Sequence, residues 1–142
     1  MSRRYHTGAR WALWRWTETD SGYLGRLHLV KTPWFALCVH WIRARDPEPY
    51  LHDHPVTFLS LILRGGYFET RRVAGQARSG WRRSWNWIRA SREDQHRIDV
   101  VLPGTVTLCL MGPKRREWGF AGPDGWIYWR DYHGAQRAGT QL

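Results

Sequence analysis

The sequence predicts an all-β protein that folds as a single antiparallel β-barrel. Its apolar stretches are short and rich in Val, Ile, Leu, Trp and Tyr, and 14 Gly and 7 Pro are spread between them, as strands separated by turns require. No helix signal is longer than a turn or two. The 142 residues are enough for one hydrophobic core and too few for a second. We therefore expect one domain over residues 1–142.

About eight or nine strands are expected in this domain. They cover residues 24–30, 35–43, 56–64, 67–73, 84–89, 96–102 and 105–111, with shorter pieces near 117–120 and 126–129. Gly65-Gly66 is typical of a two-residue hairpin, because primed turns need the positive φ that glycine adopts without steric cost. Pro103-Gly104 is typical of a type II turn for a similar reason. The segments before residue 24 and after residue 111 are expected to cover the barrel.

The most informative motif is Leu51-His52-Asp53-His54-Pro55. One residue between two histidines places both imidazoles on one face of a strand and Asp53 on the other. His96 opens a later apolar strand, whose same face should carry Ile98, Val100 and Leu102. Two neighbouring imidazoles and a third from another strand can hold a divalent metal and leave one side open for a substrate. The sequence thus predicts a metal site at His52, His54 and His96.

No carboxylate in the sequence is well placed to complete this site. Asp46 and Glu48 precede it in a Pro-rich loop and could cap its mouth. If Gly65-Gly66 forms a tight turn, Glu69 pairs opposite Ile62 and lies about 26 Å along the strand from His54, at ~3.3 Å per residue. We therefore expect a centre of three histidines without a carboxylate ligand.

These features resemble the cupin superfamily of small jelly-roll barrels. The first cupin motif is Gly, five residues, His-x-His, three or four residues, Glu, six residues, Gly. His52, His54 and Gly65 fall on that pattern, whereas Asp46 replaces its first Gly and Phe58 or Leu59 replaces its metal-binding Glu. The second motif keeps only its histidine, His96. The resemblance covers roughly residues 24–111, extends to cupin-like proteins of bacteria and their phages, and implies a jelly-roll barrel with metal-centred chemistry.

Three functions are expected from this resemblance and from the arginines described below. Cupins with three-histidine sites include thiol dioxygenases, which favours an Fe(II) oxygenase acting on an anionic small molecule or peptide. A non-redox metal-dependent isomerase or lyase remains open, as does a non-catalytic module that binds a ligand or nucleic acid. Imidazole ligands also suit Zn, Ni, Mn and Cu, so the metal is not fixed by the sequence. Dimerisation by an edge strand is common among cupins, and a homodimer is a further expectation.

The net charge of +10 favours anionic partners. Arginine carries almost all of it, with 20 Arg against 2 Lys. Arg64 and Arg97 are candidates for binding the anion of a substrate beside the metal, although their facing is open. His40 is a lesser candidate for lining the pocket, and both His40 and His28 are expected to be mainly structural.

The segment 70–97 mixes arginines with Trp81, Trp85 and Trp87. Single-stranded nucleic acid is bound by such mixtures, through phosphate contacts and base stacking. A solvated hairpin whose tryptophans alternate into the core explains the same pattern, and we favour that interpretation. The candidate nucleic-acid contacts are Arg71, Arg72, Arg78, Arg82 and Arg83.

The sequence also bears on the compartment. No stretch approaches about 18 apolar residues, and the Arg-rich start lacks both an apolar core and a cleavage site. We therefore expect a cytoplasmic protein without membrane contact. Cys38 and Cys109 each lie in an apolar run, without Cys-x-x-Cys spacing, and are expected to be buried reduced thiols.

Overall fold

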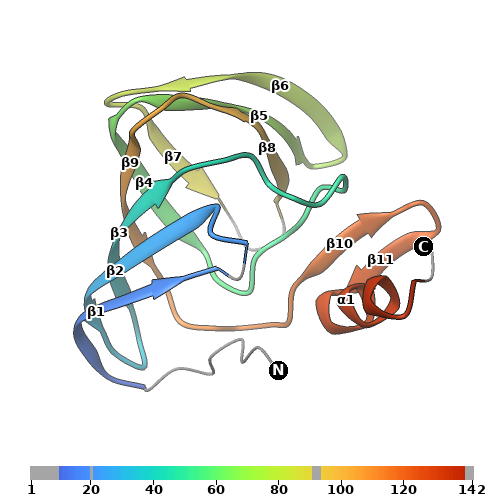
Figure 1. Ribbon diagram of the computed structural model, residues 1–142, viewed down its shortest axis with the longest axis horizontal. Helices are drawn as coiled ribbons and strands as arrows, with labels where there is room; N and C mark the ends of the chain where they lie inside the picture. The colour runs from blue at the N-terminus through green and yellow to red at the C-terminus, as the bar shows by residue number, and fades with distance from the viewer. Residues whose placement is uncertain (1–9, 20, 91–93, 140–142) are drawn as a thin grey trace.

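The computed structural model describes residues 10–19, 21–90 and 94–139, which form a mainly antiparallel β structure (Figure 1). The elements in chain order are β1 (Ala12–Glu18), β2 (Leu24–Lys31), β3 (Ala36–Ile42), β4 (Phe58–Arg64), β5 (Gly66–Val73), β6 (Gln76–Arg83), β7 (Trp87–Ala90), β8 (Gln95–Val101), β9 (Thr105–Met111), β10 (Gly119–Gly122), β11 (Gly125–Tyr128) and α1 (Trp129–Arg137). The predicted all-β class is confirmed.

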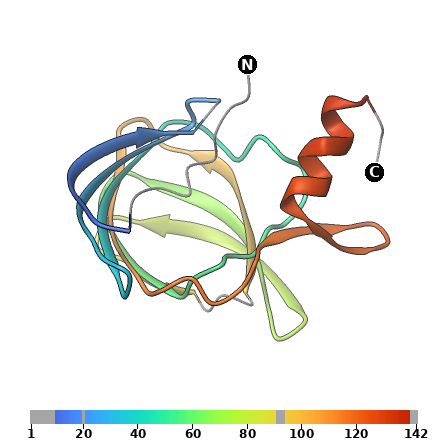
Figure 2. The ribbon, with the colours of Figure 1, turned by 90° about the horizontal axis from the view of Figure 1, so that it is seen from below.

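Two sheets make the barrel, and a small C-terminal unit lies beside it (Figures 1 and 2). The larger sheet has the order β1-β2-β3-β9-β4-β7, and the smaller one has the order β6-β5-β8. Ile42 and Ile62 of the first sheet pack against Tyr67 and Ile98 of the second, and these residues form the centre of the hydrophobic core. The hairpin β10–β11 and α1 stand at one side of the barrel.

The predicted hairpin at Gly65-Gly66 is wrong. β4 pairs with β9 and β7, whereas β5 pairs with β6 and β8, so the two glycines carry the chain from one sheet to the other. Their φ angles are +75° and +154°, and a Cβ on Gly66 would lie 2.3 Å from the Arg82 carbonyl oxygen. Glycine is needed here for a corner of the barrel. Pro103-Gly104 makes a similar crossing, from β8 to β9.

A β-bulge in β8 changes which residues face the core. Phe68 pairs with Val100 and Glu69 pairs with Ile98, so Asp99 is an extra residue on this strand. Beyond the bulge the alternation is reversed. Val100 is therefore 48% exposed, while Val101 packs against the core, and the predicted inward position of Val100 is wrong.

The elements β1, β6 and α1 were not expected from the sequence. β1 and β6 are edge strands of their sheets and carry mostly exposed side chains. α1 is docked through Tyr132, whose ring lies 4.2 Å from that of Phe120. No helix in the described part of the chain is both long and apolar enough to cross a membrane. Cys38 and Cys109 are buried and free, as predicted.

Candidate metal centre

The segment before β4 is held between two strands at His52. The main chain of His52 exchanges two hydrogen bonds of 2.9 Å with that of His96 on β8. On its other side, Ala121 donates to the carbonyl of Leu51 and Asp53 donates to that of Gly119, which ties the segment to β10. His52 thus forms isolated bridges to β8 and β10 instead of lying in a regular strand. The clamped backbone still places both imidazoles on one side, as the spacing predicts.

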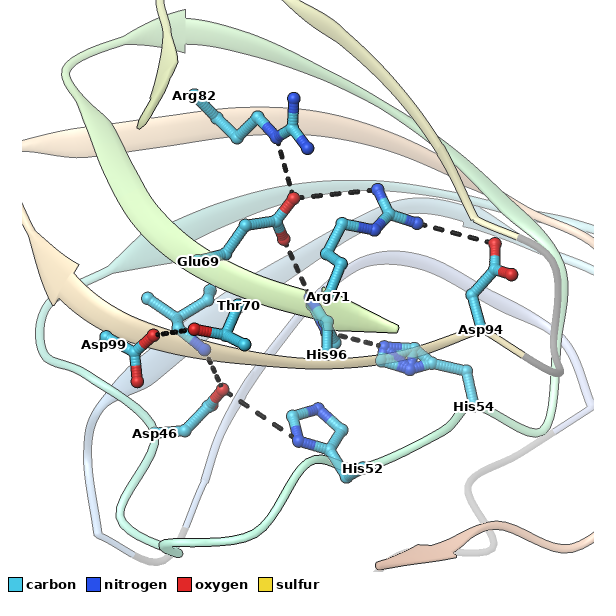
Figure 3. A network of polar contacts seen from close by, with 11 residues as sticks. Asp46, His52, His54, Glu69, Thr70, Arg71, Arg82, Asp94, His96 and Asp99 are labelled. Carbon is cyan, nitrogen blue, oxygen red and sulfur yellow. Dashed lines mark hydrogen bonds and ion pairs between the residues drawn. The ribbon is translucent and has the colours of Figure 1, made fainter. Parts of the chain in front are cut away.

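The imidazoles of His52, His54 and His96 come together as one cluster (Figure 3). Their ring centroids are 4.8–5.1 Å apart, and the Nε2 atoms of His54 and His96 are separated by 3.1 Å. Two nitrogens that each bind a zinc-like metal at ~2.0–2.1 Å are about 3.3 Å apart in a tetrahedral site. One ligand atom from each histidine lies within 4.8 Å of the others. The cluster therefore fits a single divalent metal.

Burial favours the neutral form of two of these histidines. It lowers the pKa of His52 well below its usual range, and the neighbouring His96 and His54 lower it further. It also lowers the pKa of His54, with smaller contributions from His96, Arg26 and Arg71. Both imidazoles are therefore neutral near pH 7, and neutral imidazole is the form that binds metals.

Glu69 orients the third histidine. Its Oε2 lies 3.0 Å from His96 Nδ1, and a carboxylate in this position accepts the Nδ1 proton and leaves Nε2 free for a metal. Glu69 is 1% exposed, and its Oε1 accepts a 2.8 Å hydrogen bond from Arg82 Nε and lies 3.7 Å from Arg71 (Figure 3). Burial opposes its charge, but the bonds from His96 and Arg82 and the charge of Arg71 hold its pKa below the usual value.

The predicted pairing of Glu69 with Ile62, far from the histidines, is wrong, whereas the prediction that Glu69 is not a metal ligand is not contradicted. That pairing assumed a tight turn at Gly65-Gly66, whereas the crossing between sheets brings β5 beside β8 and places Glu69 next to His96. Glu69 contacts the candidate ligand His96 and does not belong to the cluster itself. Among the residues that the structure describes, no carboxylate joins the cluster of three histidines.

Two aspartates support the clamped segment from opposite sides. Asp46 accepts a 2.7 Å hydrogen bond from the backbone nitrogen of Ile98, and its Oδ2 lies 3.9 Å from His52 Nδ1. Burial raises the pKa of Asp46. Asp53 faces away from the histidines, as predicted, and accepts hydrogen bonds from the Gly119 backbone, Arg116 and Trp126.

The other predicted pocket residues are placed differently. Arg64 is exposed at the end of β4, beside Gly104. Arg97 donates to Asp99 at 2.6 Å and to the carbonyl of Pro49, on the opposite side of β8 from His96. The structure brings neither guanidinium to the histidine cluster. His40 lies inside the barrel, where its Nε2 accepts a 3.0 Å hydrogen bond from Arg26.

The five arginines proposed for nucleic acid divide into two groups. Arg71 and Arg82 turn toward Glu69, the carboxylate beside His96. The exposed ones are Arg72, Arg78 and Arg83, and Arg83 lies over the ring of Trp81. Trp81 and Trp85 are also exposed, and the side chain of Trp87 lies outside the described residues. The hairpin therefore offers fewer free cations than its sequence indicates.

Comparison with solved structures identifies the fold. Hydroxypropylphosphonic acid epoxidase from S. wedmorenis matches with a TM-score of 0.53 at 13% identity, over 69% of this chain and 54% of the epoxidase. A candidate mannose-6-phosphate isomerase from Ralstonia eutropha JMP134 matches with a TM-score of 0.54 at 15% identity, over 63% and 84% of the two chains. An RmlC-like cupin from Shewanella frigidimarina NCIMB 400 matches with a TM-score of 0.51 at 17% identity, over 81% and 95%.

The chain therefore has the cupin fold, as its histidine motif implies. It carries a histidine cluster fit for a metal at the place where the predicted motif lies. It spans about half the length of the epoxidase. No protein-family model matches the sequence, and no curated protein matches it.

Proposed function

We propose that this protein is a mononuclear metalloenzyme of the Fe(II) oxygenase type that acts on a small anionic substrate. The observation that carries the proposal is the cluster of three histidines with no carboxylate among the described groups near enough to join it. Three protein ligands leave coordination positions open for a substrate. Structures of the same fold include one described as the Fe(II) form of HppE, with a TM-score of 0.55 at 12% identity, which supports iron as the first metal to test.

The residues of the cluster would bind the metal, and an anionic substrate would balance its charge. His52, His54 and His96 would hold the metal, and Glu69 would fix His96 in the tautomer that binds it. A bound divalent ion would supply Lewis-acid polarisation and, as Fe(II), a redox-active centre. Three neutral imidazoles do not neutralise a dication. An anionic substrate would do so, which is the reason for the proposed substrate class.

A non-redox isomerase or lyase is the second candidate. It would use the same three ligands with a metal such as Zn, and the candidate mannose-6-phosphate isomerase with this fold favours it. Metal identity separates the two candidates, because an oxygenase requires a redox-active ion whereas an isomerase does not.

The decisive experiment is elemental analysis of the protein purified without added metal. We expect about one metal per chain, because three imidazoles bind borderline divalent ions tightly, and near zero in the His52→Ala, His54→Ala double variant. The matched control is His28→Asn, a barrel histidine outside the cluster, which should keep its metal. Full occupancy in the double variant would refute the site, and oxygen uptake by the iron form with no uptake by the zinc form would select the oxygenase.

A further inference from the structure

One row of side chains across the larger sheet points into the barrel. Arg26 of β2 is paired with His40 of β3, His40 with Thr107 of β9, and Thr107 with Ile62 of β4. Ile62 is 0% and Thr107 is 1% exposed, so this row faces the interior. The hydrogen bond from Arg26 Nε to His40 Nε2 confirms that the arginine side chain lies on the same face.

Arg26 is a cation without an anionic partner among the described residues. Its guanidinium donates a hydrogen bond to His40, an imidazole whose pKa burial lowers well below the usual range, with further lowering by Arg26 and His28. The ion pairs of the described arginines and lysines involve other residues. Arg71, by contrast, lies near Glu69 and Asp94. A guanidinium inside a barrel beside neutral groups is unfavourable unless an anion joins it.

The histidine cluster is joined to the same interior through Phe58. The ring of His54 stacks at 4.9 Å on that of Phe58, which lies on the same inner face of β4 as Ile62. The histidine cluster and the arginine row therefore open on the same interior.

Thr107 supplies a second, independent observation on the same row. Its hydroxyl is buried and has no hydrogen-bond partner among the described residues. Buried hydroxyls are normally satisfied, so the Thr107 hydroxyl keeps a hydrogen bond available to a bound group. Thr107 is the direct cross-strand neighbour of His40, which binds Arg26.

We propose that Arg26 and Thr107 form an oxyanion-binding subsite inside the barrel, which takes the acid group of a substrate whose other end reaches the three histidines. This proposal rests on the proposed function and narrows the substrate to a small bifunctional acid: a metal-coordinating hydroxyl or similar donor at one end and a carboxylate or phosphonate at the other. Arginine binds both oxyanions through paired N–H donors, and a threonine hydroxyl adds one further donor.

The test measures binding to the zinc-loaded protein, so that no turnover is needed. The probes are ω-hydroxy carboxylates of graded length, the ω-hydroxy phosphonates of the same lengths, and the ω-hydroxy amides as neutral isosteres. Calorimetry measures the affinity of each probe. We expect one acid to bind about 10- to 100-fold more tightly than its amide, because the arginine bond is charge-assisted. The comparison of carboxylate with phosphonate tells which acid the subsite prefers.

Three variants decide the assignment. Arg26→Gln should remove the preference for the acid, and the exposed Arg78→Gln should keep it. Thr107→Val should weaken acid binding several-fold and yet leave the ligand-free protein at least as stable, because it deletes a buried hydroxyl that has no partner. Equal binding of acid and amide, or a preference that survives Arg26→Gln, would overturn the subsite.

Metal content is measured in every variant, which separates this proposal from the function on which it rests. If wild type and Arg26→Gln both hold one zinc per chain and neither prefers an acid, only the subsite is refuted. If wild type holds no metal, the proposed function is refuted. The subsite is then judged by acid-against-amide binding to the metal-free protein, where the loss of preference in Arg26→Gln is again the supporting result.

Discussion

At the scale of single residues, Glu69 decides how the histidine cluster is arranged. A buried carboxylate that accepts a bond from His96 and two contacts from arginines is a fixed anion behind the ligand. Such partners set ring orientation and raise the basicity of the metal-binding nitrogen. The acid would therefore contribute to metal affinity without touching the metal.

We expect Glu69→Gln to weaken metal binding about 10- to 100-fold, because the amide is uncharged and no longer fixes the Nδ1 proton of His96. Competition with a chromophoric chelator measures the affinity. The ¹⁵N shifts of His96 report the tautomer directly. The control is Asp99→Asn, a carboxylate of the same strand as His96 that binds Thr70 and Arg97. An unchanged affinity in Glu69→Gln, or an equal loss in Asp99→Asn, would contradict this role.

The barrel histidines make the metal-free protein sensitive to acid. Burial, with Arg26, Lys31 and Arg15, lowers the pKa of His28 to about 4, and burial lowers that of His40 well below its usual range. In the unfolded chain each histidine takes up a proton near pH 6.5. Between pH ~6.5 and ~4 the unfolded state thus binds more protons than the folded state. The free energy of unfolding should therefore have its highest value above pH 6.5 and decrease as the pH falls through this window.

Urea unfolding of the metal-free protein at pH 7.5, 6 and 5 measures this loss of stability. His28→Gln should reduce the slope, because one of the groups that titrates only in the unfolded state is removed. A stability that stays constant from pH 7.5 to 5 would show that these imidazoles are protonated in the folded barrel.

At the scale of elements, the C-terminal hairpin is joined through Asp53 to the segment that carries His52 and His54. The carboxylate accepts hydrogen bonds of 2.6–2.8 Å from Arg116, Gly119 and Trp126. We expect Asp53→Asn to lower the free energy of unfolding by about 1.5–3 kcal/mol, because the amide presents a donor to groups that are themselves donors. Hydrogen exchange at Gly119 and Ala121 should accelerate.

The control for this variant is Glu117→Gln. Glu117 is an exposed acid of the same segment and binds Lys114. Its replacement should change the free energy of unfolding by no more than about 0.5 kcal/mol. If the two variants unfold at the same denaturant concentration, Asp53 does not join the hairpin to the barrel.

The strands and turns differ in how well the sequence could predict them. Strands such as β2, β3 and β9 carry apolar runs, and these runs predict them almost to the residue. β6 contains Gln76-Ala-Arg-Ser-Gly80, whose polar pattern belongs to an exposed edge and gives no burial signal. The corner at Gly65-Gly66 has the residues of a hairpin, because both structures need positive φ. Only the non-local pairing of β4 and β5 distinguishes them.

The residues of the candidate site also divide into those that the sequence could predict and those that it could not. His52, His54 and His96 follow from spacing and resemblance, since one residue between two histidines sets their common side whatever the strand. Glu69 and Arg26 could not be predicted from motif spacing, because their approach to the histidines depends on how the strands pair in the sheets. An acid or arginine in the middle of a strand with apolar neighbours, as in Tyr67-Phe68-Glu69, is the one local signal that indicates an inward charge.

At the scale of the whole molecule, the histidine cluster joins parts that are distant in the chain. His52 and His54 precede β4, whereas His96 lies on β8 of the other sheet. A metal bound there would close a long loop and stabilise only the folded state. We expect a metal at about 100 times its dissociation constant to raise the free energy of unfolding by about 2.7 kcal/mol.

Thermal unfolding with and without zinc measures this stabilisation, and EDTA should reverse it. His96→Ala should abolish the shift, while Arg78→Gln, on the exposed hairpin, should keep it. A shift that persists in His96→Ala would mean that the metal stabilises the protein from elsewhere.

The bridges at His52 also bear on the rate at which a metal would leave. A ligand must swing aside before an ion can exchange, and the main chain of His52 is bonded to β8 on one side while its neighbours are bonded to β10 on the other. His96 is held by its own strand and by Glu69. His54 is held mainly by its ring contacts, including the stack on Phe58, so its imidazole is the one expected to detach first. If a metal binds here, its exchange would be slow and would begin at His54, because the backbone is paired on both sides of His52.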